Sequence, residues 1–381
     1  MKKTAIAALL ITASTIATAQ TAYRKTYTDS KQVSVEGTLN DAGKRTGNWT
    51  WWYPTGQVSQ QGSYVNGNKS GVWTVYYEDG SRMSEECYST GVSRSWFRNG
   101  DLKSEVNVQD GKRTGIYRSW YDNGQQEEEV TYIDGLREGA TTQWHHNGKI
   151  KFSGTYLHDN LSGKATWWFA SGNTDMEGLF VDGKQDGDWK YYWRSNGKLG
   201  IEGHYDKGKE SGHWVYYYET GEKWREGDYR NGQRQLKWTT YYESGKKLHE
   251  GQYANGLEQG DWYAWYENGA VDYYGFFNEG KKDGEWRGLY DDGSTRYIIH
   301  FDDDEKNGEE IRYYPSGKLE LRQNFKDGLL DGNYERYDEA GGLVEKGQFI
   351  EGEKEGKWVW YENGKEVYSS RFKAGQPVKK K

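Results

Sequence analysis

Several residue types are scarce in this 381-residue chain, and each scarcity excludes a class of protein. The single cysteine, Cys87, excludes an internal disulfide and a metal centre held by several cysteines. Three prolines exclude collagen and a proline-rich linker. Hydrophobic residues make up only 34% of the chain and few are aliphatic, so a conventional layered enzyme of this length is not expected. An excess of one charge sign is also missing, because 51 basic and 58 acidic residues are interspersed, and no nucleic-acid partner is expected.

Glycine and aromatic residues take the place of the aliphatic ones. The chain has 51 glycines, 19 tryptophans, 33 tyrosines and 10 phenylalanines. An aromatic content of 16% argues against disorder, since disordered chains are poor in aromatic residues. Together, these proportions are typical of a repetitive β protein.

The first nineteen residues have the pattern of a secretory signal peptide. Lys2 and Lys3 precede a small apolar run, Ala5–Thr18, and Ala17-Thr18-Ala19 matches a cleavage site. The run is short and rich in Ala and Thr for a membrane span, and no transmembrane segment is expected after cleavage. We therefore expect residues 1–19 to be removed, and the mature protein to be exported to the periplasm, the outer surface or the medium.

A repeat of about 24 residues fills the rest of the chain. An aromatic-x-x-Gly unit recurs with its glycine at Gly56, Gly80, Gly100, Gly124, Gly148, Gly172, Gly197, Gly221, Gly245, Gly269, Gly293, Gly317, Gly341 and Gly364. The repeats cover residues 37–375 and leave an N-terminal segment or cap, 20–36, and a basic tail, 376–381. Short aromatic runs favour strands, and Asn-Gly pairs such as Asn99-Gly100 favour tight turns. The prediction is an all-β fold, an elongated open sheet of about fourteen antiparallel hairpins with about 28 strands, twisted or coiled.

The spacing within each unit resembles the MORN repeat in its bacterial variant form. The shared pattern is Gly-x-aromatic-x-x-Gly-x-x-x-Gly, as in Gly62, Tyr64, Gly67 and Gly71. This chain departs from the common repeat by placing a tryptophan, such as Trp73, where another glycine is usual. The resemblance implies a hairpin array that acts as a scaffold or binding surface without catalysis of its own. Proteins of this variant are often labelled YwqK-family antitoxins, so neutralisation of a toxin is one alternative.

Two aromatic sets are expected to form a core on one face of the sheet. Counting from the glycine that opens each aromatic strand (Gly71 is position 0), tryptophan or tyrosine recurs at position +2 and an aromatic residue at +6. Even offsets share a face, so these rings are expected to stack with those of the partner strand, such as Tyr64. The +6 set is Tyr53, Tyr77, Phe97, Tyr121, Phe169, Trp193, Tyr218, Tyr242, Tyr266, Tyr290 and Tyr314.

A third aromatic set, at position +5, is expected on the opposite face. It consists of Trp52, Tyr76, Trp96, Trp120, Trp144, Trp168, Tyr192, Tyr217, Tyr241, Trp265, Tyr313 and Tyr337. These rings would repeat about every 9.6 Å, which suits a binding ladder for a partner or a polysaccharide. The alternative is that they only cover glycine-rich backbone, or that the sheet coils so that both of its faces are partly buried.

Chemical motifs are not found. The seven histidines and the acidic runs lack the spacing of a metal site, and no nucleophile motif or phosphate loop occurs. We therefore expect no catalytic residues, no metal and no cofactor. The predicted function is an exported, non-enzymatic scaffold for a protein partner, with glycan binding and toxin neutralisation as alternatives. Such an array could also self-associate through the unpaired edges of its terminal strands.

Overall fold

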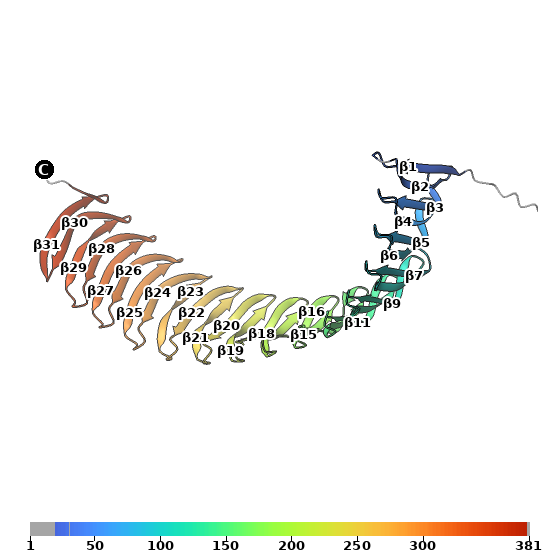
Figure 1. The fold of residues 1–381 in the computed structure, drawn as a ribbon. Coiled ribbons are helices and arrows are strands. Elements are labelled where there is room, and N and C mark those ends of the chain that lie inside the picture. The colour runs from blue at the N-terminus through green and yellow to red at the C-terminus, as the bar shows by residue number, and fades with distance from the viewer. Residues whose placement is uncertain (1–19, 30, 379–381) are drawn as a thin grey trace, which may run out of the picture. The chain divides into compact units, whose positions relative to one another are not determined.

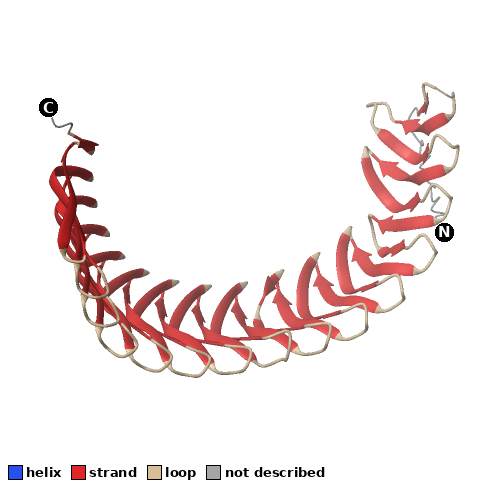
Figure 2. Cartoon of the chain, turned by 60° about the vertical axis from the view of Figure 1, so that its left-hand side comes forward, coloured by secondary structure: helices blue, strands red, loops and turns tan. Residues whose placement is uncertain are grey.

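The computed structural model describes residues 20–29 and 31–378, and the regular structure in them is entirely β. Strands and loops alternate throughout the described chain (Figure 2). The predicted all-β fold of antiparallel hairpin repeats in an open sheet is confirmed, with 32 strands among the described residues. The predicted signal segment, 1–19, and Lys379–Lys381 of the predicted tail lie outside those residues.

The described chain divides into two compact units. Unit 1 extends to Ser162 and also includes Ala170–Gly172, whereas unit 2 comprises Gly163–Phe169 and the residues from Asn173 onward. Within each unit, strands that follow one another in the chain pair antiparallel and lie side by side as hairpins (Figure 1).

Unit 1 contains thirteen strands in its described part. They are β1 (Thr21–Thr26), β2 (Val33–Leu39), β3 (Arg45–Trp52), β4 (Val58–Val65), β5 (Asn68–Tyr76), β6 (Arg82–Cys87), β7 (Gly91–Trp96), β8 (Leu102–Gln109), β9 (Lys112–Trp120), β10 (Gln126–Ile133), β11 (Leu136–Trp144), β12 (Ile150–Leu157) and β13 (Asn160–Leu161). The segment 20–36, interpreted from sequence as a terminal segment or cap, contributes β1 and the start of β2, which pair from Thr21 with Leu39 onward.

Unit 2 contains nineteen strands in its described part. They are β14 (Gly163–Trp168), β15 (Thr174–Val181), β16 (Lys184–Tyr192), β17 (Leu199–Asp206), β18 (Lys209–Tyr217), β19 (Lys223–Arg230), β20 (Gln233–Tyr241), β21 (Lys247–Ala254), β22 (Leu257–Trp265), β23 (Val271–Asn278), β24 (Lys281–Leu289), β25 (Thr295–Asp302), β26 (Glu305–Tyr313), β27 (Leu319–Lys326), β28 (Leu329–Tyr337), β29 (Leu343–Ile350), β30 (Glu353–Glu362), β31 (Lys365–Lys373) and β32 (Gln376–Pro377).

Tight turns join each strand pair because the sequence supplies residues that accept a left-handed backbone. Between β4 and β5, Asn66 and Gly67 have φ of 50° and 89°, and the turn joins Val65 and Asn68, which pair directly. Two consecutive positive φ values are what a two-residue hairpin turn requires, and the Asn-Gly pair is the combination that adopts them most easily. The other turn of each repeat is longer: the Tyr53 amide donates to the Gln57 carbonyl and the Gly56 amide to the Tyr53 carbonyl.

A β-bulge recurs near the end of each aromatic strand. In the pairing of β3 with β4, Trp51 lies opposite Gln60 but Trp52 lies opposite Val58, so Ser59 has no partner residue. The same shift falls between Val75 and Tyr76 in the next repeat. A bulge bends the strand and strengthens its twist. The unpaired residue lies on the partner strand, so alternation along the aromatic strand continues to position +5.

Candidate functional site

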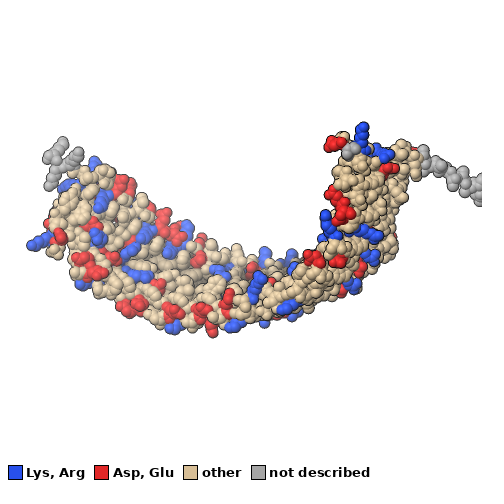
Figure 3. Space-filling model, viewed as in Figure 1, with Lys and Arg blue, Asp and Glu red and all other residues tan. Residues whose placement is uncertain are grey.

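The two faces of the sheet carry different side chains. We call the face with positions +2 and +4 the Trp face, and the face with positions +1, +3 and +5 the ladder face. In β5 these are Trp73 and Val75 on the Trp face, and Val72, Thr74 and Tyr76 on the ladder face. Acidic and basic side chains are intermixed on the surface of each unit (Figure 3).

The +2 tryptophans form the core of the Trp face. Trp49, Trp73, Trp189 and Trp358 are each only 1% exposed, although the sheet is a single layer. Each ring lies flat over a glycine of the preceding strand, and a Cβ on Gly62 would lie 2.3 Å from the Trp73 ring.

Polar and edge-on aromatic contacts hold each tryptophan in place. The Trp73 Nε1 donates to the Ser63 carbonyl (3.0 Å), and Tyr64 packs edge-on against the same ring with centroids 4.9 Å apart. The same indole-to-carbonyl bond recurs for Trp49, Trp189, Trp214, Trp238, Trp286 and Trp358.

The structure corrects the prediction for the +6 aromatic residues. The aromatic strands end at or near position +5, so alternation no longer fixes the face of the residue that follows. Instead of stacking in the core, the +6 tyrosines bind the backbone of the next repeat: the Tyr242 hydroxyl donates to the Trp265 carbonyl (2.8 Å). The rings that do stack on the +2 tryptophans are at +4, where sequence reasoning placed no function. Trp51 lies 5.6 Å from Trp49 and 5.4 Å from Trp73.

The twelve predicted ladder residues all lie at position +5, and every one is half-buried. Trp52, Tyr76, Trp96, Trp120 and Trp144 follow one another in unit 1, and the remaining seven lie in unit 2. The rings are therefore partly covered by the ladder face, yet each keeps some surface open to solvent.

A row of glutamates on the preceding strands fixes the tyrosines of the ladder. The hydroxyls of Tyr192, Tyr217 and Tyr241 donate to Glu177 (2.9 Å), Glu202 (2.6 Å) and Glu226 (2.6 Å). Burial and the carboxylate beside each hydroxyl raise the pKa of all three tyrosines to about 12. These phenols are consequently neutral donors at physiological pH.

Lysines and arginines pair with the same glutamates. Lys164 lies 2.9 Å from Glu177, and the hydrogen bonds from Lys164 and Tyr192 lower the pKa of that carboxyl despite its partial burial. Lys237 and Lys247 both pair with Glu250, at 3.1 and 2.6 Å. The ladder face thus combines open aromatic edges with paired charges at a constant spacing, a combination that suits a protein or sugar surface.

Several shallow hollows open on the two faces. Two on the ladder face lie over glycines, one of about 360 Å³ beside Gly203 and one of about 530 Å³ beside Gly347. A hollow of about 480 Å³ on the Trp face is lined by His249, Glu258, Trp262, Tyr273, Phe277, Lys282, Trp286 and Tyr297. Sequence reasoning missed this one, although the small residues Ala264 and Gly288 at position +4 signal it.

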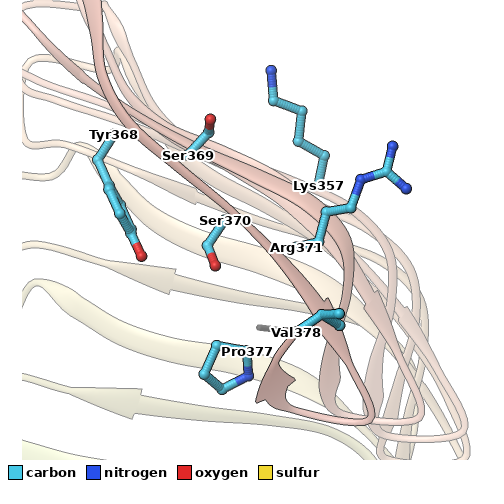
Figure 4. A pocket seen from close by; sticks show the side chains of 7 residues that line it. All are labelled: Lys357, Tyr368, Ser369, Ser370, Arg371, Pro377 and Val378. Atoms are coloured by element: carbon cyan, nitrogen blue, oxygen red, sulfur yellow. The ribbon is translucent and has the colours of Figure 1, made fainter. Parts of the chain in front are cut away.

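A further hollow, of about 870 Å³, surrounds the last full strand of unit 2. Figure 4 shows its lining, with Tyr368 and Ser370 pointing to one side of β31 and Lys357 and Arg371 pointing away from them. The hollow follows the outer edge of β31 beside β32, where the repeat pattern stops. Its two serines, Ser369 and Ser370, have no histidine or carboxylate among the other lining residues, Lys357, Tyr368, Arg371, Pro377 and Val378.

Among the described residues, no group of three or more His, Cys, Asp or Glu side chains is placed to hold a metal ion. The same part of the chain contains no helix that is long and apolar enough to cross a membrane.

The comparisons with known proteins place the chain in a family. The model of the MORN repeat variant matches eight times, at residues 45–66, 69–90, 89–110, 113–134, 137–158, 210–231, 234–255 and 306–327. The chain is a MORN-repeat protein, which confirms the resemblance seen in the sequence, and such repeats indicate a protein-binding module. No curated protein matches it.

Solved structures align with the chain at low similarity. One is the crystal structure of TcdB2–TccC3, with 12% identity and a TM-score of 0.16 over 89% of this chain and 23% of that one. Another is the Photorhabdus luminescens Tc holotoxin pore, also with 12% identity and a TM-score of 0.16, over 93% of this chain and 22% of that one. The chain spans less than a quarter of the length of these proteins.

Proposed function

We propose that this protein is an exported, non-enzymatic scaffold that binds a partner protein along its ladder face. The observation that carries the proposal is the row of half-buried +5 rings beside paired charges, repeated at the same position of the strands. Aromatic side chains that are held rigid by their neighbours contribute most to protein interfaces, because little side-chain entropy is lost on binding. Many such contacts at a fixed spacing would add through avidity.

Export is supported by the sequence pattern of residues 1–19 and is tested separately. We expect the full-length protein, expressed in its own host, to be recovered outside the cytoplasm with Gln20 as its first residue. N-terminal sequencing of the fractionated protein measures this. Recovery of an uncleaved cytoplasmic chain would contradict the export part of the proposal and leave the binding part standing.

Partner binding is tested by affinity isolation with matched variants. Tagged residues 20–381 are used to isolate partners from an envelope extract of the host, in parallel with a variant carrying Trp96→Ala, Trp120→Ala and Trp144→Ala. We expect a stoichiometric protein that binds the unmodified chain and binds the triple variant at least about tenfold more weakly. Trp224→Ala, an exposed tryptophan outside the ladder, is the control and should bind as the unmodified chain does.

Two outcomes would contradict the protein-scaffold proposal. One is the absence of any stoichiometric protein partner, and the other is unchanged affinity of the triple variant while circular dichroism shows that its fold is intact. Capture of a toxin would assign the antitoxin role that the family resemblance implies.

Glycan binding is a second candidate because the ladder rings repeat about every 9.6 Å, close to the length of a disaccharide. It predicts retention of the chain on insoluble cell-wall polysaccharide and release by soluble glycan. The triple tryptophan variant should not be retained. Retention that is independent of these three tryptophans would exclude the ladder as the glycan site.

A further inference from the structure

Trp262 is the exception among the eight tryptophans at position +2 in the described chain. The other seven are buried and donate their Nε1 hydrogen to a backbone carbonyl. Trp262 is only half-buried, and its Nε1 has no hydrogen-bond partner. One face of its ring is therefore less well covered than in the other repeats.

Two covering groups are missing at Trp262. The first is the +4 ring, because Ala264 occupies that position in the same repeat and Thr240 occupies it in the preceding one. The second is a cation at position −2, because Glu258 stands there. In neighbouring repeats, Arg234 lies 4.8 Å from the centre of the Trp238 ring and Lys282 lies 4.7 Å from that of Trp286.

Loss of the +4 ring alone, or of the −2 cation alone, does not expose a +2 tryptophan to solvent. Trp214 also has an acid at −2, Glu210, but it is covered by the +4 ring of Tyr216, whose centre lies 6.2 Å away. Trp214 is consequently only 3% exposed. The repeat around Trp262 combines both losses, and the result is the hollow of about 480 Å³ described above, hereafter the Trp262 hollow.

The walls of the Trp262 hollow are aromatic. Phe277 lies 5.5 Å from Trp262 and 5.0 Å from Trp286, both edge-on, and Tyr273 lies 6.0 Å from Trp286. Tyr297 closes one end by lying over Gly288, where a Cβ would come within 2.2 Å of its ring.

The charged side chains that line the Trp262 hollow are Lys282 and Glu258, and the titratable His249 lies beside them. Lys282 is already engaged, since its Nζ lies 4.7 Å from the Trp286 ring and 5.2 Å from that of Phe301. Burial lowers the pKa of His249, in spite of the nearby Asp272 carboxylate, so this imidazole is neutral at physiological pH. The carboxylate of Glu258 accepts a hydrogen bond from the Tyr253 hydroxyl, which is a neutral group, so its charge can still balance that of a bound group.

We propose that the Trp262 hollow binds the lysine or arginine side chain of a partner protein. The proposal rests on the proposed protein-binding function and adds a contact on the opposite face. Its physical basis is that the chain itself places Arg45, Lys69, Arg234, Lys282 and Lys354 over the equivalent tryptophans. A partner's cation would take the same place over Trp262, attracted by the face of the ring and by Glu258.

The first test titrates the whole mature chain with small probes. We expect N-acetyl-lysine N-methylamide to bind at least about tenfold more tightly than its apolar analogue, N-acetyl-norleucine N-methylamide, in ligand-observed NMR. Equal binding of the two probes would overturn the proposal. Choline is the third probe, and binding of choline tenfold tighter than the lysine probe would overturn the assignment to a protein side chain.

Two variants close the hollow with residues that the repeat already uses. Ala264→Trp supplies the ring found at Trp51, Trp167 and Trp360, and Glu258→Lys supplies the cation found at Lys282. Because other repeats carry both residues at these positions, the fold should persist. Each variant should lose the lysine probe by at least about tenfold. Glu210→Lys, the same change beside the covered Trp214, is the control and should bind as the unmodified chain does.

The same variants separate this proposal from the proposed function. If the isolated partner binds the Ala264→Trp variant as well as the unmodified chain, the hollow is overturned as a contact and the scaffold function stands. If the unmodified chain isolates no partner, the scaffold function and the protein source of the cation both fail. Loss of partner affinity in Ala264→Trp, with affinity unchanged in the Glu210→Lys control, supports both.

Discussion

Each +2 tryptophan of this protein depends on a glycine in the preceding strand. The Trp214 ring occupies the space that a side chain on Gly203 would need, since a Cβ there would lie 2.1 Å from the ring. The two residues also change together along the chain. Where position +2 lacks tryptophan, a larger residue replaces the glycine in the pairs Val106/Tyr117, Val130/Thr141, Ile299/Glu310 and Gln323/Tyr334. The pair Gly154/Ala165 keeps its glycine because the Phe152 ring fills the space instead.

This coupling predicts a compensating double substitution. Gly203→Val should destabilise the fold by about 3 kcal/mol through overpacking, and Trp214→Thr by about 3 to 5 kcal/mol through a lost ring. The double variant reproduces the natural pair Val130/Thr141 and should cost less than the sum by more than about 1 kcal/mol. Hydrogen exchange of the amides in β17 and β18 measures the three effects. Strict additivity would show that the ring and the glycine are not coupled.

Leu236 has a strained backbone conformation, and this strain lowers the stability of its repeat. It replaces the glycine that opens the aromatic strand, yet it keeps a φ of 57° and its side chain is 60% exposed. A residue that carries a Cβ is strained in this left-handed conformation, whereas glycine is not. The exposed side chain gives little packing in return.

Leu236→Gly should therefore stabilise the repeat by about 1 kcal/mol. The reverse change at the equivalent position, Gly212→Leu, should destabilise its own repeat by about the same amount. Hydrogen exchange in β19–β20 and in β18–β19 compares the two. A loss of protection on Leu236→Gly would mean that the leucine side chain contributes more than the strain costs.

At the scale of the element, a tyrosine that follows many of the strands links one repeat to the next. Nine such hydroxyls donate to the carbonyl of the +5 residue that follows: Tyr27, Tyr53, Tyr77, Tyr121, Tyr218, Tyr242, Tyr266, Tyr290 and Tyr314. These bonds act on the end of the strand, where the bulge has already interrupted the ladder of backbone hydrogen bonds. They connect neighbouring hairpins by side chains as well as by backbone.

Loss of one such hydroxyl should loosen the following strand. Tyr242→Phe removes the bond to the Trp265 carbonyl and should cost about 1 kcal/mol. The matched change in the other direction is Phe97→Tyr, which adds a hydroxyl at the same position and should stabilise its repeat by a similar amount. Hydrogen exchange at the ends of β22 and β9 reports each effect. Unchanged protection in Tyr242→Phe would show that water replaces the hydroxyl at no cost.

At the scale of the whole molecule, the tyrosines of the ladder make the fold sensitive to alkali. Burial and hydrogen-bonded carboxylates raise the pKa of Tyr192, Tyr217 and Tyr241 to about 12, from an ordinary value near 10. In the unfolded chain these phenols ionise near pH 10, whereas in the folded chain they stay neutral until about pH 12. Their contribution to stability is complete below pH 10 and is lost as the pH rises from 10 to 12.

The thermal unfolding temperature should thus fall steadily over that pH interval. Circular dichroism melts at intervals from pH 9 to pH 12 measure it, with tyrosinate absorbance recorded in parallel. A variant with Tyr192, Tyr217 and Tyr241 all changed to Phe should show a shallower fall. An identical pH profile for this variant would assign the alkaline loss to other groups.

The sequence by itself determined the fold and the place of the ladder. A glycine and an aromatic ring that recur every 24 residues define hairpins, because turn chemistry and strand alternation are local properties. The same alternation placed Trp120 and its eleven equivalents at one position of their aromatic strands, and the structure has them there. Their role in binding stays a prediction.

Tertiary structure decided which rings stack and which surface is open. The aromatic strand ends at Tyr241, and the Tyr242 hydroxyl after it binds the Trp265 carbonyl of the next repeat instead of joining the core. The alternation pattern alone does not show where a strand ends. The exposure of Trp262 likewise depends on Glu258 before it in the strand and Ala264 after it, together with Phe277 from the next strand. Burial is a property of all neighbours at once, so the small residue at position +4 is a signal in the sequence that acquires its meaning only when the folded chain shows which rings cover each tryptophan.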